Sequence, residues 1–500
     1  MHIQRIQVPD FRALKNVDIT FEKEFTPRIF PLGSQNGGGK STLLQLIFVL
    51  LHCAGNPDRV EFIQNLLHDF YVKDKSGKRT LAIIDIWDGS KTVTLDFFVC
   101  NKKFISELLE SEYEINIHPR IKYTIHDSIQ NTEKNINNLN YKKKYLSGII
   151  DTLNKMKENA TYVYAKKEHI ERISKEMNTI KRYILDLGIS INDRLDYFNI
   201  MNPTENNVSD LLSIIEETIE EYKKKIDEMY IELEHLEDLL EKFLNSLGKC
   251  KTLYLCDFPT RQDNNFESEV LLCQADNDNE VVKKLLTELS ENIFLSAHIS
   301  QVFLFLPSET RKLLLKGQSN EDNYYLELQD KKSALPGLFT YDFLAVDTII
   351  ESFKDARDKD FKQAIETGEY GNNYKTLMNE LYAILSNKKV NIDSDFSGIN
   401  FKLDSDGTEL YPEDLSHGEL KRLCIYTWMK HNKIRDAIVL MDELEISFHP
   451  DWQYQIVRDL EEWGATNQYI LATHSYEICQ AVTPAHVKEL EPKLSSKTIQ

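Results

Sequence analysis

The stretch Gly33 to Thr42, which reads GSQNGGGKST, constrains the fold more than any other part of this chain. It follows a short apolar run, Ile29 to Leu32, and leads directly into Ser41 to His52, which is almost wholly apolar and long enough for a helix. A strand that ends in a glycine-rich loop and continues into a helix is the building unit of α/β sheets. The sequence therefore predicts an α/β fold, with Ile29 to Leu32 as a buried strand.

The same loop has the residue types of a phosphate-binding site. Glycines let backbone N–H groups close around phosphate oxygens at the start of a helix. Lys40 would neutralise the β- and γ-phosphates of a nucleotide, and the Ser41 hydroxyl would bind Mg²⁺. The usual G-x-x-x-x-G-K pattern needs glycine where this chain has Ser34, so we expect an altered loop geometry with binding retained. The predicted ATP-binding residues of the loop are Gly33, Ser34, Asn36, Gly37, Gly38, Gly39, Lys40, Ser41 and Thr42.

Two further apolar runs end in residues suited to phosphate chemistry. Ala437 to Met441 is followed by Asp442 and Glu443. Asp442 is predicted to hold Mg²⁺ together with Ser41, and Glu443 to polarise the attacking water as a general base. Buried strands often end in acidic residues, so this pair alone would be weak evidence for an ATPase. Together with the glycine-rich loop it is strong evidence. The run from Tyr469 ends at His474, which is predicted to contact the γ-phosphate.

A fourth motif, Leu415 to Glu419 (LSHGE), precedes a predicted helix that starts at Leu420. Ser416, Gly418 and Glu419 at a helix N-terminus would form an anion-binding site. The same residues also fit a purely structural alternative, in which Ser416 caps the helix and Glu419 completes a capping box.

With these motifs together, the chain resembles the ABC, SMC, RecF and OLD class of P-loop ATPases. In that class the LSxGE signature of one subunit contacts the γ-phosphate bound by another. The resemblance implies a homodimer with ATP sandwiched between two heads, or a higher oligomer built from it, and gives Glu443 and His474 catalytic roles. Lys40 and Ser416 are 376 residues apart, which fits the split heads of RecF, SMC and OLD proteins better than transporter ATPases.

Smaller features support the resemblance and also depart from it. Glu445 and the pair His449-Pro450 are similar to the Asp-Glu-Pro-Glu…His-Pro stretch of RecF- and OLD-like ATPases, with Leu444 in place of the proline. His449 stands where transporter heads have an aspartate. The Q-loop glutamine cannot be assigned, and Gln64 is only a guess.

The middle of the chain has a helical repeat of apolar residues. They recur at spacings of three and four from Leu146 to Leu187 and again from Val208 to Leu247, on either side of a linker with Asn202-Pro203. The stretch Lys142 to Asp186 has 11 basic against 6 acidic residues, and Glu205 to Lys249 has 5 against 13. We expect an antiparallel coiled-coil hairpin, with two separate bundle helices as the alternative.

The predicted fold is therefore an ABC-type α/β head, with a mixed sheet, flanking helices and an N-terminal antiparallel hairpin at His2 to Phe21, interrupted by the helical hairpin. Its expected parts are an N-terminal lobe of the head (1–140), the helical insertion (141–250), a mixed α/β region (251–395) and a C-terminal lobe (396–500). Gln301 to Leu306 (QVFLFL) is predicted to be a buried strand.

Composition limits the partners and the location. The net charge of −20 disfavours nonspecific coating of DNA or of acidic membranes, although local nucleic-acid contacts remain open. Seven scattered cysteines without a C-x-x-C pair indicate neither disulfides nor zinc. The chain has no signal-peptide pattern and no apolar run that could span a membrane, so a cytoplasmic location is expected.

Within its class the chain looks most like the Septu-type PtuA ATPases of bacterial antiphage defence, including those associated with retrons. The resemblance implies a separate HNH nuclease partner of the PtuB type and, in a retron, a reverse transcriptase with its DNA product. Only 26 residues follow His474, so an appended nuclease domain is not expected. The alternatives are a RecF- or SMC-like repair ATPase that clamps DNA, and a nucleotide-gated structural module with negligible turnover.

Overall fold

The computed structural model describes residues 1–34, 37–73, 76–110, 121–160, 205–262, 265–298, 305–306, 310–311, 329–341, 345–385 and 387–490. The chain divides into two compact units. The first joins Met1–Ile115 to Leu247–Gln500, and the second is Asn116–Ser246. The second unit thus begins earlier than residue 141, where the sequence placed the start of the helical insertion.

A six-stranded parallel sheet forms the centre of the first unit. Its strand order is β15 (Lys488–Glu489), β3 (Ile29–Gly33), β14 (Gln468–Ala472), β13 (Ile438–Asp442), β8 (Ile293–His298) and β9 (Leu338–Tyr341). All neighbouring strands run parallel. Parallel strands present their carboxyl ends at one edge, so the glycine-rich loop after β3 and the motifs after β14 and β13 meet there.

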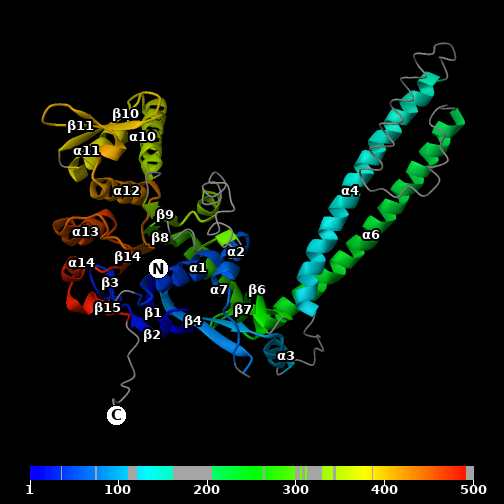
Figure 1. Cartoon of the computed structure of the whole chain (residues 1–500), viewed down its shortest axis with the longest axis horizontal. Coiled ribbons are helices and arrows are strands. Elements are labelled where there is room, and N and C mark those ends of the chain that lie inside the picture. Colours follow the sequence, from blue (N-terminus) through cyan, green and yellow to red (C-terminus); the bar gives the residue numbers. More distant parts are fainter. Residues whose placement is uncertain are drawn as a thin grey trace. The chain divides into compact units, whose positions relative to one another are not determined.

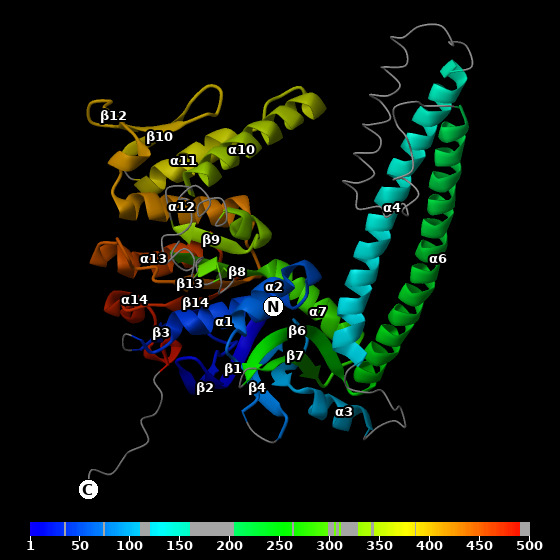
Figure 2. The same ribbon diagram turned by 45° about the vertical axis from the view of Figure 1, so that its right-hand side comes forward.

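Helix α1 (Lys40–Cys53) lies between this sheet and a second, antiparallel one (Figure 2). The core around α1 takes Ile3 and Ile84 from the antiparallel sheet and Leu440 and Ile470 from the parallel sheet. A helix covered on both sides must be apolar all round, which is why its sequence lacks a polar face. The antiparallel strands, in order, are β2 (Leu14–Thr20), β1 (His2–Phe11), β4 (Lys78–Trp87), β5 (Thr92–Cys100), β7 (Asn265–Ala275) and β6 (Thr252–Gln262).

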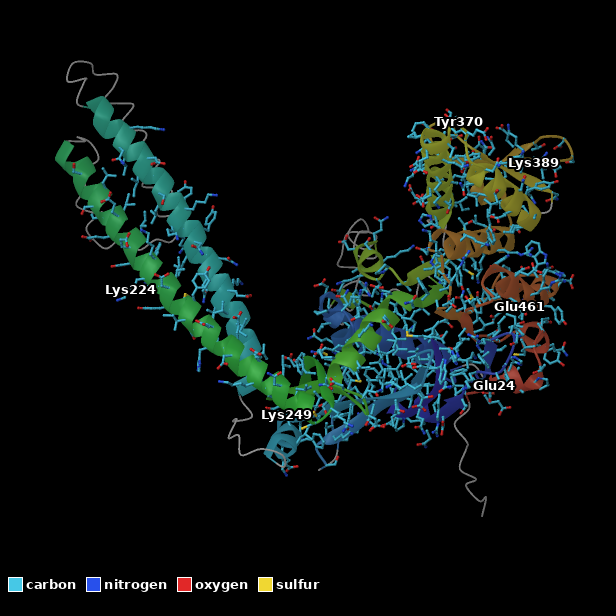
Figure 3. The ribbon with its side chains drawn as sticks, turned by 180° about the vertical axis from the view of Figure 1, so that it is seen from behind. Glu24, Lys224, Lys249, Tyr370, Lys389 and Glu461 are labelled. Carbon is cyan, nitrogen blue, oxygen red and sulfur yellow. The ribbon has the colours of Figure 1, made fainter. Side chains whose placement is uncertain are left out.

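The other face of the parallel sheet carries a separate core. Val439 and Met441 of β13 point into it, whereas Ile438 and Leu440 point toward α1, as strand alternation requires. Helices α12 (His417–His431) and α13 (Pro450–Trp463) cover this face (Figure 1). Beyond them lies a small lobe, marked by Tyr370 and Lys389 in Figure 3. It consists of α10 (Ala345–Thr367), α11 (Asn373–Leu385), β10 (Lys388–Ile392), β11 (Ile399–Leu403) and β12 (Glu409–Leu410).

The predicted hairpin at His2 to Phe21 is confirmed as the antiparallel pair β1 and β2. The strand predicted at Gln301 to Leu306 lies mostly outside the described residues; Phe305 and Leu306 are buried but are not in a strand. A strand that the sequence did not predict, β8, ends at His298, shortly before this segment. Further helices in the described part of the first unit include α2 (Val60–Leu66), α3 (Lys102–Glu110), α7 (Asn279–Asn292) and α14 (Tyr476–Gln480), and 3₁₀ turns lie at Pro57–Arg59, Pro412–Asp414 and Pro484–His486.

The second unit contains two long helices, α4 (Ile121–Ala160) and most of α6 (Glu205–Lys249), which lie side by side (Figures 1 and 2). Helix α4 begins well before the predicted start at Leu146, because Ile129, Thr132 and Ile136 extend its buried side through a polar stretch rich in asparagine. Because this stretch contains few apolar residues, the apolar repeat could not be recognised there from the sequence. The later part of the first predicted run, with the linker, lies outside the described residues.

An apolar seam runs along this helix pair. Leu146 and Leu153 of α4 and Ile215 of α6 are fully buried. The ion pairs of α6 within the described residues stay inside that helix, for example Lys224 with Glu228 (Lys224 is marked in Figure 3). The opposite charges of the two arms are therefore not used as ion pairs across the seam in the described part. Among the described helices, none combines the length and the apolar character needed to cross a membrane.

The seam gives a stability prediction with a matched control. Ile215→Ala removes a fully buried side chain and should destabilise the helix pair by about 2–4 kcal/mol through the cavity it leaves. Ile231→Ala makes the same change on the same helix at a position that is 69% exposed, and should cost less than about 0.5 kcal/mol. Hydrogen exchange of peptides from α4 and α6 in the full chain measures both. Equal protection in the two variants would contradict the seam.

Candidate active site

The glycine-rich loop has the backbone geometry of an anion site. Gly37 and Gly39 have φ of 82° and 90°, a left-handed conformation that favours glycine. A side chain at Gly39 would also lie 2.7 Å from the Leu14 side chain. Gly39 caps α1 without a side-chain hydrogen bond, which leaves the first N–H groups of the helix for a ligand. Ser34 has no positive φ, so serine fits there, while Asn36 lies outside the described residues.

Lys40 connects the loop to the third motif. Its side chain is 94% buried, and its Nζ lies 3.1 Å from both the carbonyl and the hydroxyl oxygen of Ser34 and 3.4 Å from Nδ1 of His474. Burial lowers the pKa of Lys40, whereas Glu445, Asp442 and Glu443 act to raise it. The loop lysine, the predicted γ-phosphate histidine and a group of carboxylates therefore share one small region.

Ser41 and Asp442 lie together, as predicted for a magnesium site. The Ser41 hydroxyl donates to Oδ1 of Asp442 over 3.0 Å. Burial raises the pKa of Asp442 to about 6, and the Ser41 hydrogen bond acts against this rise. An alcohol and a buried carboxylate oxygen are donors that Mg²⁺ accepts, with phosphate oxygens and water completing its shell. The described residues contain no group of three or more His, Cys, Asp and Glu side chains placed to hold a metal, so an all-protein site is not formed there.

Glu443 opens a tight turn that runs to Phe448, which we call the carboxylate turn. Its φ is 51°, a strained conformation for a residue with a side chain, and its N–H donates to the Ala472 carbonyl over 2.9 Å. Ser447 in the same turn also has a positive φ, 74°. The turn thus fixes the direction in which the Glu443 carboxylate leaves the sheet edge.

Glu445 is a second acid of this turn, and the sequence pointed to it only through the resemblance to RecF- and OLD-like ATPases. Its Oε1 accepts the backbone N–H of His474 over 2.6 Å. Its Oε2 is buried and has no hydrogen-bond partner among the described residues. Glu445 therefore joins the carboxylate turn to the histidine loop through Oε1, and its Oε2 is a buried hydrogen-bond acceptor.

The signature residues lie elsewhere. Ser416 caps α12 by accepting the Glu419 N–H, and the Glu419 carboxylate accepts the Ser416 N–H, so the capping box is present. Burial acts to raise the pKa of Glu419, but hydrogen bonds from Lys388 and Ser416 leave it below its usual value. A side chain at Gly418 would lie 2.6 Å from the Ser447 carbonyl oxygen, so glycine is required for packing against the carboxylate turn.

Gln64 is not supported as the Q-loop residue. It lies on α2, where its amide donates to the Asp257 carbonyl over 2.8 Å. His449 is 70% exposed and caps α13, with the Asp451 N–H 3.4 Å from its Nδ1. Strand β8 lies beside β13 and runs parallel to it. Its last residue, His298, therefore lies at the same edge of the sheet as Asp442.

The raised pKa of Asp442 gives a prediction about stability and pH. Asp442→Asn should stabilise the nucleotide-free chain near pH 7.5 by on the order of 2 kcal/mol, because it removes a buried charge. The pKa of Asp442 is higher in the folded chain, about 6, than in the unfolded chain. The free energy of unfolding therefore decreases as the pH rises from the unfolded-state pKa to about 6. The advantage of the variant should therefore shrink as the pH falls from 7 to 5.

Thermal unfolding in the presence of a chelator measures this effect. Asp436→Asn is the matched control, because it removes the same charge at an exposed position just before β13. A stability difference between Asp442→Asn and the natural chain that does not change with pH would contradict a buried, titrating Asp442.

Comparisons with known proteins identify the family of this chain. The model of the AAA ATPase domain family matches residues 1–479. The chain is 34% identical over 93 residues to the retron Vc95 probable ATPase of Vibrio cholerae serotype O1 biovar El Tor, which is 16% of this chain and 18% of that one. It is 35% identical over 51 residues to the retron Ec83 probable ATPase of Escherichia coli, which is 10% of this chain and 9% of that one. The chain thus spans less than a fifth of either curated relative.

A solved SMC head domain with a coiled coil and joint, from Pyrococcus yayanosii, aligns over 96% of this chain and 93% of its own at 14% identity, with a TM-score of 0.31. An SMC head from Pyrococcus furiosus with an extended coiled coil, bound to the C-terminal domain of ScpA, aligns over 96% and 92% at 10% identity, with a TM-score of 0.30. The expectation of a P-loop ATPase related to retron ATPases is confirmed by the family match and the curated relatives. The chain belongs to the AAA ATPase domain family.

Proposed function

We propose that this chain hydrolyses ATP in a homodimer and uses its nucleotide state to regulate a separate nuclease in a bacterial antiphage system. The observation that carries the ATPase part is the convergence of Lys40, Ser41 and Asp442 with His474 at one edge of the parallel sheet. These residues come from three strand ends far apart in the sequence. Their meeting fits the binding of a triphosphate.

Each residue has a role that follows from its position. The loop N–H groups and Lys40 bind the phosphates, and His474 contacts the γ-phosphate. Ser41 and Asp442 would hold Mg²⁺, which neutralises charge on the phosphate oxygens. Glu443 accepts the proton of the attacking water, since its backbone directs it from the sheet edge beside Asp442.

The signature motif supports the dimer. Its helix α12 packs into the core on one face of the parallel sheet, whereas α1 packs into the core on the other. Ser416 is exposed at the N-terminus of α12, where the helix dipole favours an anion. A second copy in head-to-tail orientation would supply this end to the phosphates bound by the first.

A mixing experiment tests the composite pocket. Lys40→Ala should abolish ATP binding and turnover, and Ser416→Asp should abolish turnover, because it keeps a helix-capping side chain but sets a negative charge against the γ-phosphate. In an equal mixture, half of the dimers carry one intact pocket, so activity should return to about a quarter of that of the natural chain. Ser416→Asn is the matched control, a neutral capping residue that should retain most activity.

An inactive mixture would contradict a pocket shared between copies. Unchanged ATP affinity in Lys40→Ala would contradict the loop assignment itself.

Glu443→Gln tests the general base. Binding should survive while turnover falls by about 100-fold or more, because the amide cannot accept the water proton. The variant should accumulate as an ATP-bound dimer, visible by size-exclusion chromatography with light scattering. Unchanged turnover would contradict the role of Glu443, and a natural chain as inactive as the variant would favour a nucleotide-gated structural module.

The regulatory part rests on the named relatives, which are ATPases of retrons, and on the motif resemblance to Septu-type ATPases. Such a system would pair this chain with an HNH nuclease and, in a retron, with a reverse transcriptase and its DNA product. The nuclease activity of the complex should differ between Lys40→Ala and Glu443→Gln, which fix opposite nucleotide states. Equal activity would contradict control by ATP. Tight DNA binding by the chain alone would favour the DNA-clamp alternative, against its net charge of −20.

A further inference from the structure

Lys421, one turn into α12, is a buried lysine that none of the motifs accounts for. Only 8% of its surface is exposed. Its Nζ donates to the backbone carbonyls of Glu443 over 2.9 Å and of Ile446 over 3.3 Å. It also lies 4.0 Å from the ring centre of Tyr341 and 5.5 Å from that of Phe448. Two carbonyl oxygens and two aromatic faces therefore solvate this charge, and both carbonyls belong to the carboxylate turn.

Burying an ammonium group in this way is costly, because two carbonyls replace bulk water. Burial lowers the pKa of Lys421 to about 7, although Glu445, Glu443 and Asp442 all act to raise it. A methionine or leucine of similar length would fill the same space without that cost. What lysine adds over such a side chain is its pair of hydrogen bonds to the carboxylate turn.

The task is visible in the turn itself. Glu443 and Ser447 both have a positive φ, a backbone conformation that is unfavourable for a residue with a side chain. Lys421 binds the carbonyl of Glu443 and that of Ile446, the residue just before Ser447. These hydrogen bonds stabilise the strained backbone conformation. That conformation in turn sets the direction of the Glu443 side chain.

Lys421 also connects this turn to the signature motif. Gly418 and Lys421 are three residues apart on α12 and therefore on the same side of the helix, and both face the carboxylate turn. The next residue, Arg422, pairs with Asp459 of α13 over 2.7 Å in a buried ion pair. Helix α12 is thus attached to the turn and to the helix that follows it.

We infer that Lys421 is a positioning residue for hydrolysis, which holds the Glu443 backbone in its strained conformation and joins it to the signature helix. This inference rests on the proposed ATPase function. Its specific content is that loss of the Lys421 ammonium group impairs the hydrolytic step while leaving nucleotide binding to the loop intact.

Lys421→Met tests it in the full chain. The kcat for ATP hydrolysis should fall at least about tenfold, while the Kd for a fluorescent ATP analogue should stay within about threefold. Amide exchange of peptides covering 443–448 should become faster, because the turn loses its two hydrogen bonds. Lys421→Arg keeps a cation and should recover part of the rate. Lys430→Met, at an exposed position on the same helix, is the matched control and should behave as the natural chain.

The outcomes are distinct. An unchanged kcat in Lys421→Met, with the natural chain active, overturns this inference and leaves the ATPase function standing. Equal losses of kcat and of ATP affinity, with faster exchange throughout the first unit, would show a general folding role and would also overturn it. An inactive natural chain would instead refute the proposed function.

Discussion

The burial of α1 between two sheets is the constraint on which the rest of the structure depends. Because the parallel sheet covers one side of this helix and the antiparallel sheet the other, its first turn has a fixed position relative to the end of β3. In the described part of the loop between them, Gly37 and Gly39 have the left-handed backbone that an anion-binding loop uses. The site is therefore organised by packing that involves no ligand.

A second level of organisation acts on the acids. Asp442 is still part of β13 and takes its position from the sheet, whereas Glu443 and Glu445 follow in the carboxylate turn. That turn is fastened to β14 through the Ala472 carbonyl, to the histidine loop through Glu445 and to α12 through Lys421. Three separate parts of the fold thus set the geometry of one short segment.

Sequence alone could predict the parts of the site that are contiguous in the chain. Glycines before Lys40, acids after an apolar strand and histidine after another are local patterns with a known physical use, and the structure brings them together. It could not predict contacts made by residues with ordinary local surroundings. Lys421 looks like a surface residue beside Arg422, and Gln64 looks free to act, until α2 places it against Asp257.

Element boundaries failed for similar reasons. Helix α4 passes through an asparagine-rich stretch where Thr132 takes a buried position that the apolar repeat would give to a larger residue. The strand β8, which pairs with β13, was not among the predicted elements, because this pairing is a tertiary preference that local pattern does not contain. The capping box at Ser416 shows that one motif can satisfy a structural and a functional reading at once.

The close contact between Gly39 and Leu14 has a consequence beyond the cradle. Leu14 is the first residue of β2, so the glycine-rich loop packs against the edge strand of the antiparallel sheet. At the opposite edge of that sheet, β6 continues from α6 after only two residues. The same antiparallel sheet thus contacts the glycine-rich loop at one edge and, at its other edge, contains the strand that follows α6 in the chain.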